Sequence, residues 1–577
     1  MNMTLSKRLA VAVLAAHALA GAAMAEDVVW STPGTGFWDD VTNWPAGVLR
    51  TAADNVTVDI GSTTAVVRQL PGAPASPLSR FTVGSLTAKS PFEHAGGSLM
   101  VGGDATFEEA FKWSGGVLHV DATIPSGTWT FKKGLHFTAS GLVGMNAGAM
   151  ELQGHSIIEG AVGALLGTVP VHIASGATFE IRSGVQFVVQ DNFVNDGLID
   201  RTAGTDIFTI SLRGGGNQGV VRNRTGVLNF LNTFDAVTHT GAFSVDPGAE
   251  LSFQGAHMFT GEISGQGNVV FSGFHDFTVA ADKFALDGTL TLEKGAKGVW
   301  NGDGTIRNLR LNGANFLPEG NVDVINQARV DAFSIVRGAP GSRVRFQDGL
   351  ALQANLVVNG GQVELGGDTV VAGDVGLSVG RDAILTVMAG GSLRLTNDAT
   401  PSGAGAISGA GTFINKGLVE RDTGTGEFQF NVLEFINEGR LALESGSASA
   451  AVDFRQTATG TLAIELGSML GPFAVGGDAS LDGLLAISFA NGFLPTLGQR
   501  FELMTFGTRT GDFTLATAGE AARPGYTYLL HYGPNALDIE ITGLAPPVAA
   551  VPLPPMLPLF VAGLGLLAFR GRRSPGQ

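Results

Sequence analysis

The chain contains no cysteine and few charged residues. Of its 577 residues only 15% are charged, and only three are Tyr. The lack of cysteine excludes disulfide bonds and cysteine-ligated metal sites, so backbone hydrogen bonds and side-chain packing must stabilise the fold. The formal net charge of −16 argues against binding to nucleic-acid phosphates. We therefore expect no nucleic-acid partner.

Glycine and large apolar residues are abundant. The chain has 84 Gly, about twice the average share of about 7%. A disordered glycine-rich chain would lack apolar residues, but this chain is 44% hydrophobic and has 36 Phe. The composition therefore predicts a large core interrupted by many turns.

Short glycine phrases recur before strand-like runs from about residue 80 to 470. They are Gly-Gly (Gly96-Gly97, Gly115-Gly116, Gly390-Gly391), Gly-x-Gly (265–267, 302–304, 409–411) and Asn-x-Gly (195–197, 415–417, 437–439). From Gly96 to Gly115 is 19 residues and from Asn415 to Asn437 is 22, and repeats of about 20 residues are typical of the coils of a solenoid.

A longer repeat extends two of the Asn-x-Gly phrases. NDGLIDRTAGTDIFTI at 195–210 corresponds to NKGLVERDTGTGEFQF at 415–430, so that Arg201 aligns with Arg421. No long helical periodicity is present outside the two ends. We predict an all-β chain that forms a right-handed parallel β-helix, with β caps at both ends and a C-terminal transmembrane helix. Asn195, Asn415 and Asn437 are candidates for stacked corner ladders. An array of β-sandwiches is the alternative.

Both ends of the chain carry targeting patterns. Lys7 and Arg8 precede an apolar run, and Ala23 and Ala25 form a small-residue cleavage site before Glu26, which is the pattern of a secretory signal peptide. At the other end a proline-containing entry leads into an uncharged run from Leu557 to Phe569 and an arginine cluster. These features predict export and a membrane anchor with a cytoplasmic C-terminus.

The C-terminal tail resembles the sorting signal of bacterial PEP-CTERM proteins, in which a short motif, a hydrophobic helix and an arginine cluster occur in this order. Leu553 stands where the motif usually has Glu. The resemblance implies processing by an exosortase-type membrane enzyme, an envelope or extracellular location, and exopolysaccharide as a candidate partner. The residues that match are Val551, Pro552, Leu553 and Pro554 for the motif, and Arg570, Arg572 and Arg573 for the cluster.

The expected organisation has five parts. The N-terminal cap contains Gly36, Trp38, Asn43 and Trp44, which resemble the openings of autotransporter-associated repeat proteins. The parts are a signal peptide (1–25), an N-terminal cap (26–70), solenoid repeats (71–470), a C-terminal β cap (471–545) and the sorting tail (546–577).

No motif in the body predicts catalysis or metal binding. Gly376 to Gly380 matches the G-x-S-x-G elbow of hydrolases, but a strand-like segment follows it instead of a helix. Asn301 to Gly304 and three Gly-Gly-Asp units lack the further acidic ligands of a calcium loop. We interpret all of these as structural, and we expect no cofactor, no metal and no catalytic residue.

Histidine and tryptophan offer weaker candidates. His94, His119, His136, His155 and His172 recur at about the coil interval and could share one face, without a function. Trp38 and Trp44 could stack on sugars, but packing in the cap is the favoured reading. We expect an exported structural or adhesive protein; the alternative is a β-helical carbohydrate-active enzyme, whose site would be assembled from separate coils.

Overall fold

The structure is a computed structural model, and it describes most of residues 26–543. Within this part of the chain, no helix is long and apolar enough to cross a membrane. The expected transmembrane helix lies outside the described residues. The positions inside 26–543 that are not described are 32, 35, 46–53, 69–79, 121–126, 139–142, 146, 160–163, 167–168, 185, 190, 401–404, 468–470 and 516–525.

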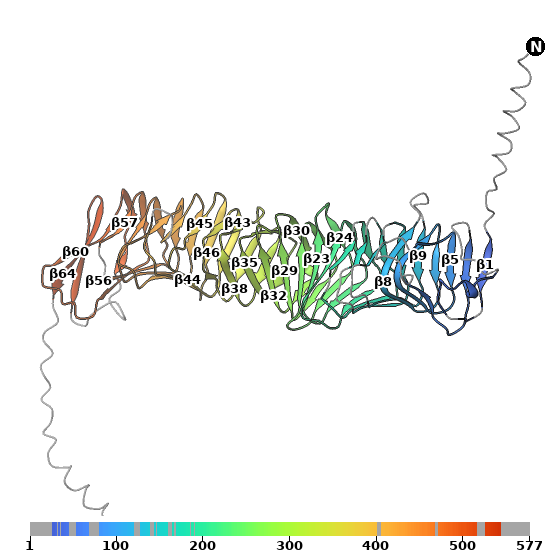
Figure 1. Cartoon of the computed structure of the whole chain (residues 1–577). Coiled ribbons are helices and arrows are strands. Elements are labelled where there is room, and N and C mark those ends of the chain that lie inside the picture. Colours follow the sequence, from blue (N-terminus) through green and yellow to red (C-terminus); the bar gives the residue numbers. More distant parts are fainter. Residues whose placement is uncertain are drawn as a thin grey trace, which may run out of the picture.

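Each coil contributes three short strands, one to each of three faces. In one coil β12 (Ala149–Leu152) lies on the first face, β13 (His155–Ile158) on the second and β14 (Ala164–Leu166) on the third. The next strand, β15 (Val171–Ile173), returns to the first face and pairs in parallel with β12. Figure 1 shows these coils stacked along one long axis.

The faces are parallel sheets; among the described residues the third face is one sheet, and the first and second faces are each divided in two. The first face has nine strands from β1 (Asp27–Trp30) to β21 (Gly214–Asn217), and thirteen more from β24 (Val237–His239) to β60 (Arg500–Thr505). With about 4.8 Å between strands, the stack is about 100 Å long. The predicted parallel β-solenoid is confirmed, and the alternative of β-sandwiches, which would require antiparallel sheets, is wrong.

Alternating side chains fill the interior. In β16 (Thr178–Ile181), for example, Phe179 and Ile181 are buried while the residues between them face outward. Phenylalanines at equivalent positions in successive coils form columns, because each coil places the same inward position directly above the last. One column contains Phe413, Phe435 and Phe454, with ring centroids 5.1 and 5.2 Å apart, and Phe473 of the first face packs against its end at 5.1 Å.

The predicted asparagine ladders are present. Asn415 donates from Nδ2 to Oδ1 of Asn437 (2.8 Å), and Asn437 donates to Oε1 of Gln456 (2.9 Å), all three being fully buried. A second ladder joins Asn195 to Asn217 at 2.6 Å. Since each amide also donates to a backbone carbonyl of the next coil, the ladders satisfy the corner backbone as well.

The glycine phrases have two different physical causes. Gly265 has a φ of +119°, a backbone conformation that other residues rarely adopt. Gly197 has no such conformation; a Cβ there would lie 2.4 Å from the carbonyl oxygen of Ala177 in the preceding coil. Glycine therefore supplies corners with positive φ in the first two phrases, whereas in Asn-x-Gly the glycine permits close stacking.

The two ends of the solenoid differ. β1 already pairs in parallel with β2 (Asn55–Val58), so coiling begins inside the segment interpreted as an N-terminal cap. Trp30, Trp38 and Trp44 cluster there. At the far end β60 pairs antiparallel with β64 (Ala536–Gly543), which forms a hairpin with β63 (Thr527–Tyr532). This antiparallel hairpin ends the first face, because it occupies the edge where another coil would add.

Candidate functional site

The predicted sorting and processing residues cannot be placed. Ala23, Ala25 and the tail from Val551 to Arg573 lie outside the described residues, and Glu26 is the first residue that the structure describes. The predictions of signal cleavage and sorting therefore stay predictions, and the candidate sites that the structure describes lie in the solenoid itself.

The hydrolase-like motif is part of a sheet. Ser378 is the central residue of β45 (Leu377–Val379), paired between Val357 and Ser408 of the neighbouring coils. A further strand, β46 (Ala383–Val387), follows it, so the sharp strand-to-helix turn of a nucleophile elbow does not form. The structural interpretation is the one that fits.

The calcium-like fragment is a turn between two strands. Asp303 accepts a hydrogen bond from the backbone N–H of Asn321 in the next coil (2.6 Å), which lowers the pKa of its carboxyl. Among the described residues, no group of three His, Asp or Glu is placed to hold a metal ion. Asp303 therefore links one coil to the next.

The histidines do not form one stripe. His136 and His155 point outward on the second face, His172 lies on the first face, and His94 is fully buried. The recurrence at about one coil is too irregular to keep them in register, since one residue of slippage moves a side chain to the other side of a strand.

His172 is held between two carboxylates from neighbouring coils. Its Nδ1 lies 2.7 Å from Glu151 and its Nε2 lies 2.9 Å from Asp196. Burial alone would lower the pKa of this imidazole, but the bonds to Asp196 and Glu151 raise it overall. Because both ring nitrogens are engaged, His172 connects three coils and has no nitrogen left to act as a general base.

Trp38 and Trp44 do not face solvent. Both are at most 3% exposed, their ring centroids are 4.8 Å apart, and Nε1 of Trp44 donates to the carbonyl of Trp38 at 2.9 Å. Trp30 completes the cluster at 5.1 Å from Trp44. Packing in the cap is thus their role, and sugar stacking at these rings is excluded in this arrangement.

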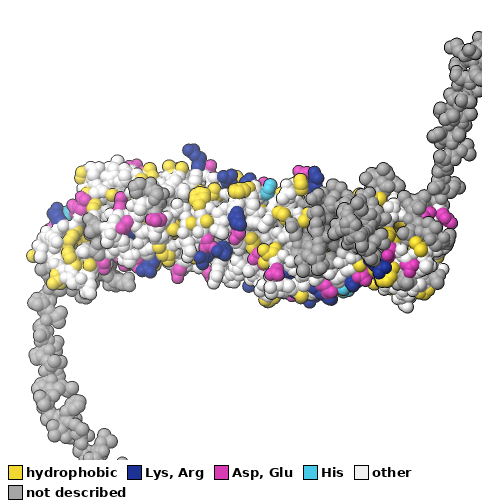
Figure 2. Space-filling model, viewed as in Figure 1, with side chains coloured by type: hydrophobic (Ala, Val, Ile, Leu, Met, Phe, Trp, Pro, Cys, Tyr) yellow, Lys and Arg dark blue, Asp and Glu magenta, His cyan; other side chains and the backbone are white. Residues whose placement is uncertain are grey.

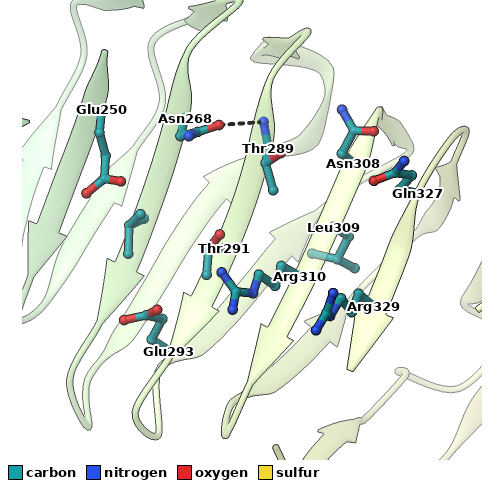
Figure 3. A pocket seen from close by; sticks show the side chains of 11 residues that line it. Glu250, Asn268, Thr289, Thr291, Glu293, Asn308, Leu309, Arg310, Gln327 and Arg329 are labelled. Atoms are coloured by element: carbon teal, nitrogen blue, oxygen red, sulfur yellow. Dashed lines mark hydrogen bonds between the residues drawn. The ribbon is translucent and has the colours of Figure 1, made fainter. Parts of the chain in front are cut away.

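The third face contains a hollow that the sequence reasoning missed. It has a volume of about 400 Å³ and lies over five strands (Figure 3): β26 (Glu250–Gln254), β29 (Asn268–Ser272), β32 (Thr289–Glu293), β35 (Asn308–Asn312) and β38 (Ala328–Ala332). Most of the side chains that line it are polar. They are Glu250, Asn268, Val270, Thr289, Thr291, Glu293, Asn308, Leu309, Arg310, Gln327 and Arg329.

Strand register explains how these residues meet. Glu250 pairs with Asn268, and Thr289 with Asn308, so one row of polar side chains crosses the sheet along its corner. A central row runs from Ser252 through Val270 and Thr291 to Arg310 and Arg329. The only sign of the hollow in the sequence is that polar residues recur at intervals of 18 to 21. Intervals of this length are found throughout the chain for structural reasons, so they do not mark a site.

The charges of the hollow are mixed. Asp331 accepts hydrogen bonds from both Arg310 and Arg329, which fixes the two guanidinium groups. These bonds outweigh the effect of burial and lower the pKa of Asp331. Burial, with a smaller contribution from the charge of Glu293, raises the pKa of Glu250. The surface therefore combines neutral hydrogen-bonding groups with charges that largely compensate one another.

The hollow does not preorganise an acid–base pair. Glu250 and Glu293 lie two strands and four residues apart, which places their Cα atoms about 16 Å from each other. Glycosidases need their two carboxyl groups within about 5–9.5 Å, so these side chains would have to extend toward each other. The backbone separation alone assigns no catalytic role to these two carboxyl groups.

The chain matches no protein-family model, and no curated protein is significantly similar to it.

Proposed function

We propose that this chain is an exported structural or adhesive protein of a bacterial envelope or extracellular matrix, whose solenoid acts as a rigid spacer. The observation that carries the proposal is the stack of parallel coils, about 100 Å long by the strand spacing. Such a stack holds whatever it displays at a fixed distance from its point of attachment.

Charged side chains on the outside support this role, because they join one coil to the next. On the second face Arg182 contacts Glu180 (2.8 Å) and Glu159 (3.4 Å), while His155 contacts Glu180 and His136 contacts Glu159. Hydrogen bonds from Arg182, Thr202 and His155 lower the pKa of Glu180 to about 2. Figure 2 shows basic and acidic side chains interspersed along the visible face.

The two ends of the chain supply the proposed route and attachment. The signal-peptide pattern before Glu26 would direct export, and the apolar tail with its arginine cluster would anchor the chain in the membrane until an exosortase-type enzyme removes it. Intact-mass analysis of the cell-bound and released forms tests this route. We expect loss of residues 1–25 and a released form ending near 551–554; retention of Arg573 in every form would contradict the processing.

The adhesive role is tested with cells that produce the full chain or lack it. We expect cells lacking the chain to lose attachment or matrix retention. The carbohydrate-active alternative predicts instead that purified protein releases new reducing ends from polysaccharides, and that E250Q or E293Q abolishes this release. Polysaccharide cleavage with that mutational pattern would overturn the structural proposal.

A further inference from the structure

Three phenylalanines are exposed along one corner of the solenoid. Phe234, Phe274 and Phe333 are 48%, 83% and 56% exposed, and each follows a strand of the third face, at the corner with the first. Exposed aromatic rings are costly on a soluble surface, and their alignment along one edge marks a site of interaction. Along the axis, Phe234 and Phe274 are two strand spacings apart, and Phe274 and Phe333 are three. These spacings correspond to about 10 and 14 Å.

Local structure holds these rings in place. The Oδ1 of Asn232 accepts the backbone N–H of Phe234 (3.1 Å), and the guanidinium of Arg213 lies 4.4 Å from the Phe234 ring centre. The ring of Phe274 lies over Gly295 of the next coil, where a Cβ would be 2.5 Å from it. The hydroxyl of Ser334 donates to the carbonyl of Ala332, beside Phe333. The rings of Phe234 and Phe274 are therefore held by neighbouring groups, and the turn that carries Phe333 is fixed by a hydrogen bond.

The polar hollow adjoins this edge. Phe274 comes two residues after the end of β29, and Phe333 directly after β38, and both strands lie under the hollow. Amide and hydroxyl side chains line the hollow, and these both donate and accept hydrogen bonds. The amides Asn268, Asn308 and Gln327 line the far side of the hollow, at the corner with the second face, and the central row with Thr291 lies between them and the rings. Apolar rings along one side of a face and hydrogen-bonding groups across it are complementary to sugars, which have apolar ring faces and hydroxyl rims.

The charge of the site decides between ligand classes. Arg310 and Arg329 are joined to Asp331, and Glu250 and Glu293 add two carboxylates, so three acidic groups face two basic ones. With a net charge of −16, the whole chain would also repel a polyanion. In the described part of the third face the strands are paired from coil to coil, which leaves no free strand edge there for an extended peptide.

We propose that the hollow on the third face and the corner phenylalanines together bind an uncharged polysaccharide. This inference rests on the proposed adhesive function and names its ligand class. The polysaccharide would stack on Phe274 and Phe333 and extend across the third face to hydrogen-bond to the side chains of the hollow. A protein partner that docks on the first face, where Met258 is 39% exposed, is the competing occupant.

Affinity electrophoresis of the full chain, in a detergent without a sugar headgroup, tests the proposal. The gels contain a soluble β-glucan, a galactomannan or polygalacturonate. We expect at least one neutral polymer to retard the wild type, and the dissociation constant to rise about threefold for F274A or F333A and about tenfold for the double variant. L433A is the matched control, because Leu433 is 61% exposed at another corner.

Several outcomes overturn the proposal. They are an absence of retardation by every polymer, retardation by polygalacturonate alone, and equal retardation of wild type and double variant. Loss of a protein partner in M258A, with no polymer binding, would assign the edge to protein docking. If deletion still abolishes cell attachment while no polymer binds, the adhesive function stands and only this ligand class fails.

Discussion

At the scale of single residues, buried polar side chains specify the coil register. Asn437 is fully buried and connects three coils: it accepts from Asn415, and it donates to Gln456 and to the carbonyl of Thr461. An aliphatic side chain would fill the same space in any register, whereas an amide ladder forms only when equivalent positions stack. The ladders are therefore a specificity device as well as a stabilising one.

Asn437→Ala should lower the free energy of unfolding by about 2–3 kcal/mol, because it leaves buried groups of Asn415 and Gln456 without their partner. Urea titration of the full chain, followed by circular dichroism, measures the change. The neighbouring E438A is the control, since Glu438 is solvent-exposed in part and pairs only distantly with Lys416 (3.7 Å). A change of equal size in both variants would contradict a special role for the ladder.

A buried histidine pair gives the solenoid a pH dependence. His239 and His257 are fully buried, and Nε2 of His239 lies 3.0 Å from Nδ1 of His257. Burial lowers the pKa of His239 well below its usual value, and burial lowers that of His257 to about 4. The unfolded chain therefore binds more protons than the folded chain below about pH 6.5, the ordinary histidine pKa.

Stability should consequently fall as the pH is lowered from about 6.5 to about 4. The double variant H239N/H257F should lose most of this dependence, because it places Asn and Phe where the adjoining coils already have Asn217 and Phe277. Urea midpoints at pH 7.5, 5.5 and 4.5 measure the effect. The stability that Glu180 contributes is lost only below about pH 4.5, its ordinary pKa, so Glu180 does not account for a fall between pH 7.5 and 5.5.

At the scale of elements, the sixteen-residue repeat encodes a corner instead of a face. In the first copy the strand that contains Arg201, β19 (Leu198–Arg201), lies on the second face. In the other copy the corresponding strand, β50 (Leu418–Arg421), lies on the third face. Each arginine is fully buried and donates to carbonyls of the loop that follows it. The repeat thus builds the same bend at two different corners.

Arg421→Met should destabilise the chain by about 3–5 kcal/mol, because Arg421 donates to the carbonyls of Asn397 and Gly426 and pairs with Asp398 at 2.6 Å. Limited proteolysis should cut the loop at 422–426 first. R394A removes an exposed pair with Asp422 and should cost at most about 1 kcal/mol. If the two variants unfold alike, the buried arginine does not organise the loop.

The sequence predicted the solenoid and its asparagine ladders because both depend on local spacing: Asn415 and Asn437 stand one coil apart in the chain and in the structure. The hollow could not be predicted in the same way. Its residues come from five strands, and whether Thr291 or Arg310 faces outward in one row depends on the exact length of each intervening corner. The corner phenylalanines were hidden for the same reason, since an exposed Phe274 and a buried Phe271 look alike in sequence.

At the scale of the whole molecule, the solenoid is modular. Each coil contacts chiefly its two neighbours, so the stability of such a stack is close to a sum of coil and interface contributions. Equivalent positions such as Asn415 and Asn437 pair directly across one coil of 22 residues. Removing a whole coil should therefore leave the remaining faces in register, whereas removing part of one should not.

Deletion of residues 415–436 tests this modularity and the spacer function together. The deletion joins Ile414 to Asn437, which takes the place of Asn415 in the ladder. We expect a folded rod shorter by about 5 Å, one strand spacing, by small-angle scattering. Export should be unchanged and attachment only slightly reduced.

The matched control removes residues 415–425, half a coil, and should unfold or aggregate because every later strand loses its partner. If both deletions fold equally well, coil register does not determine this fold. If the full-coil deletion folds but abolishes attachment, the function depends on a local site in that coil and not on the length of the rod.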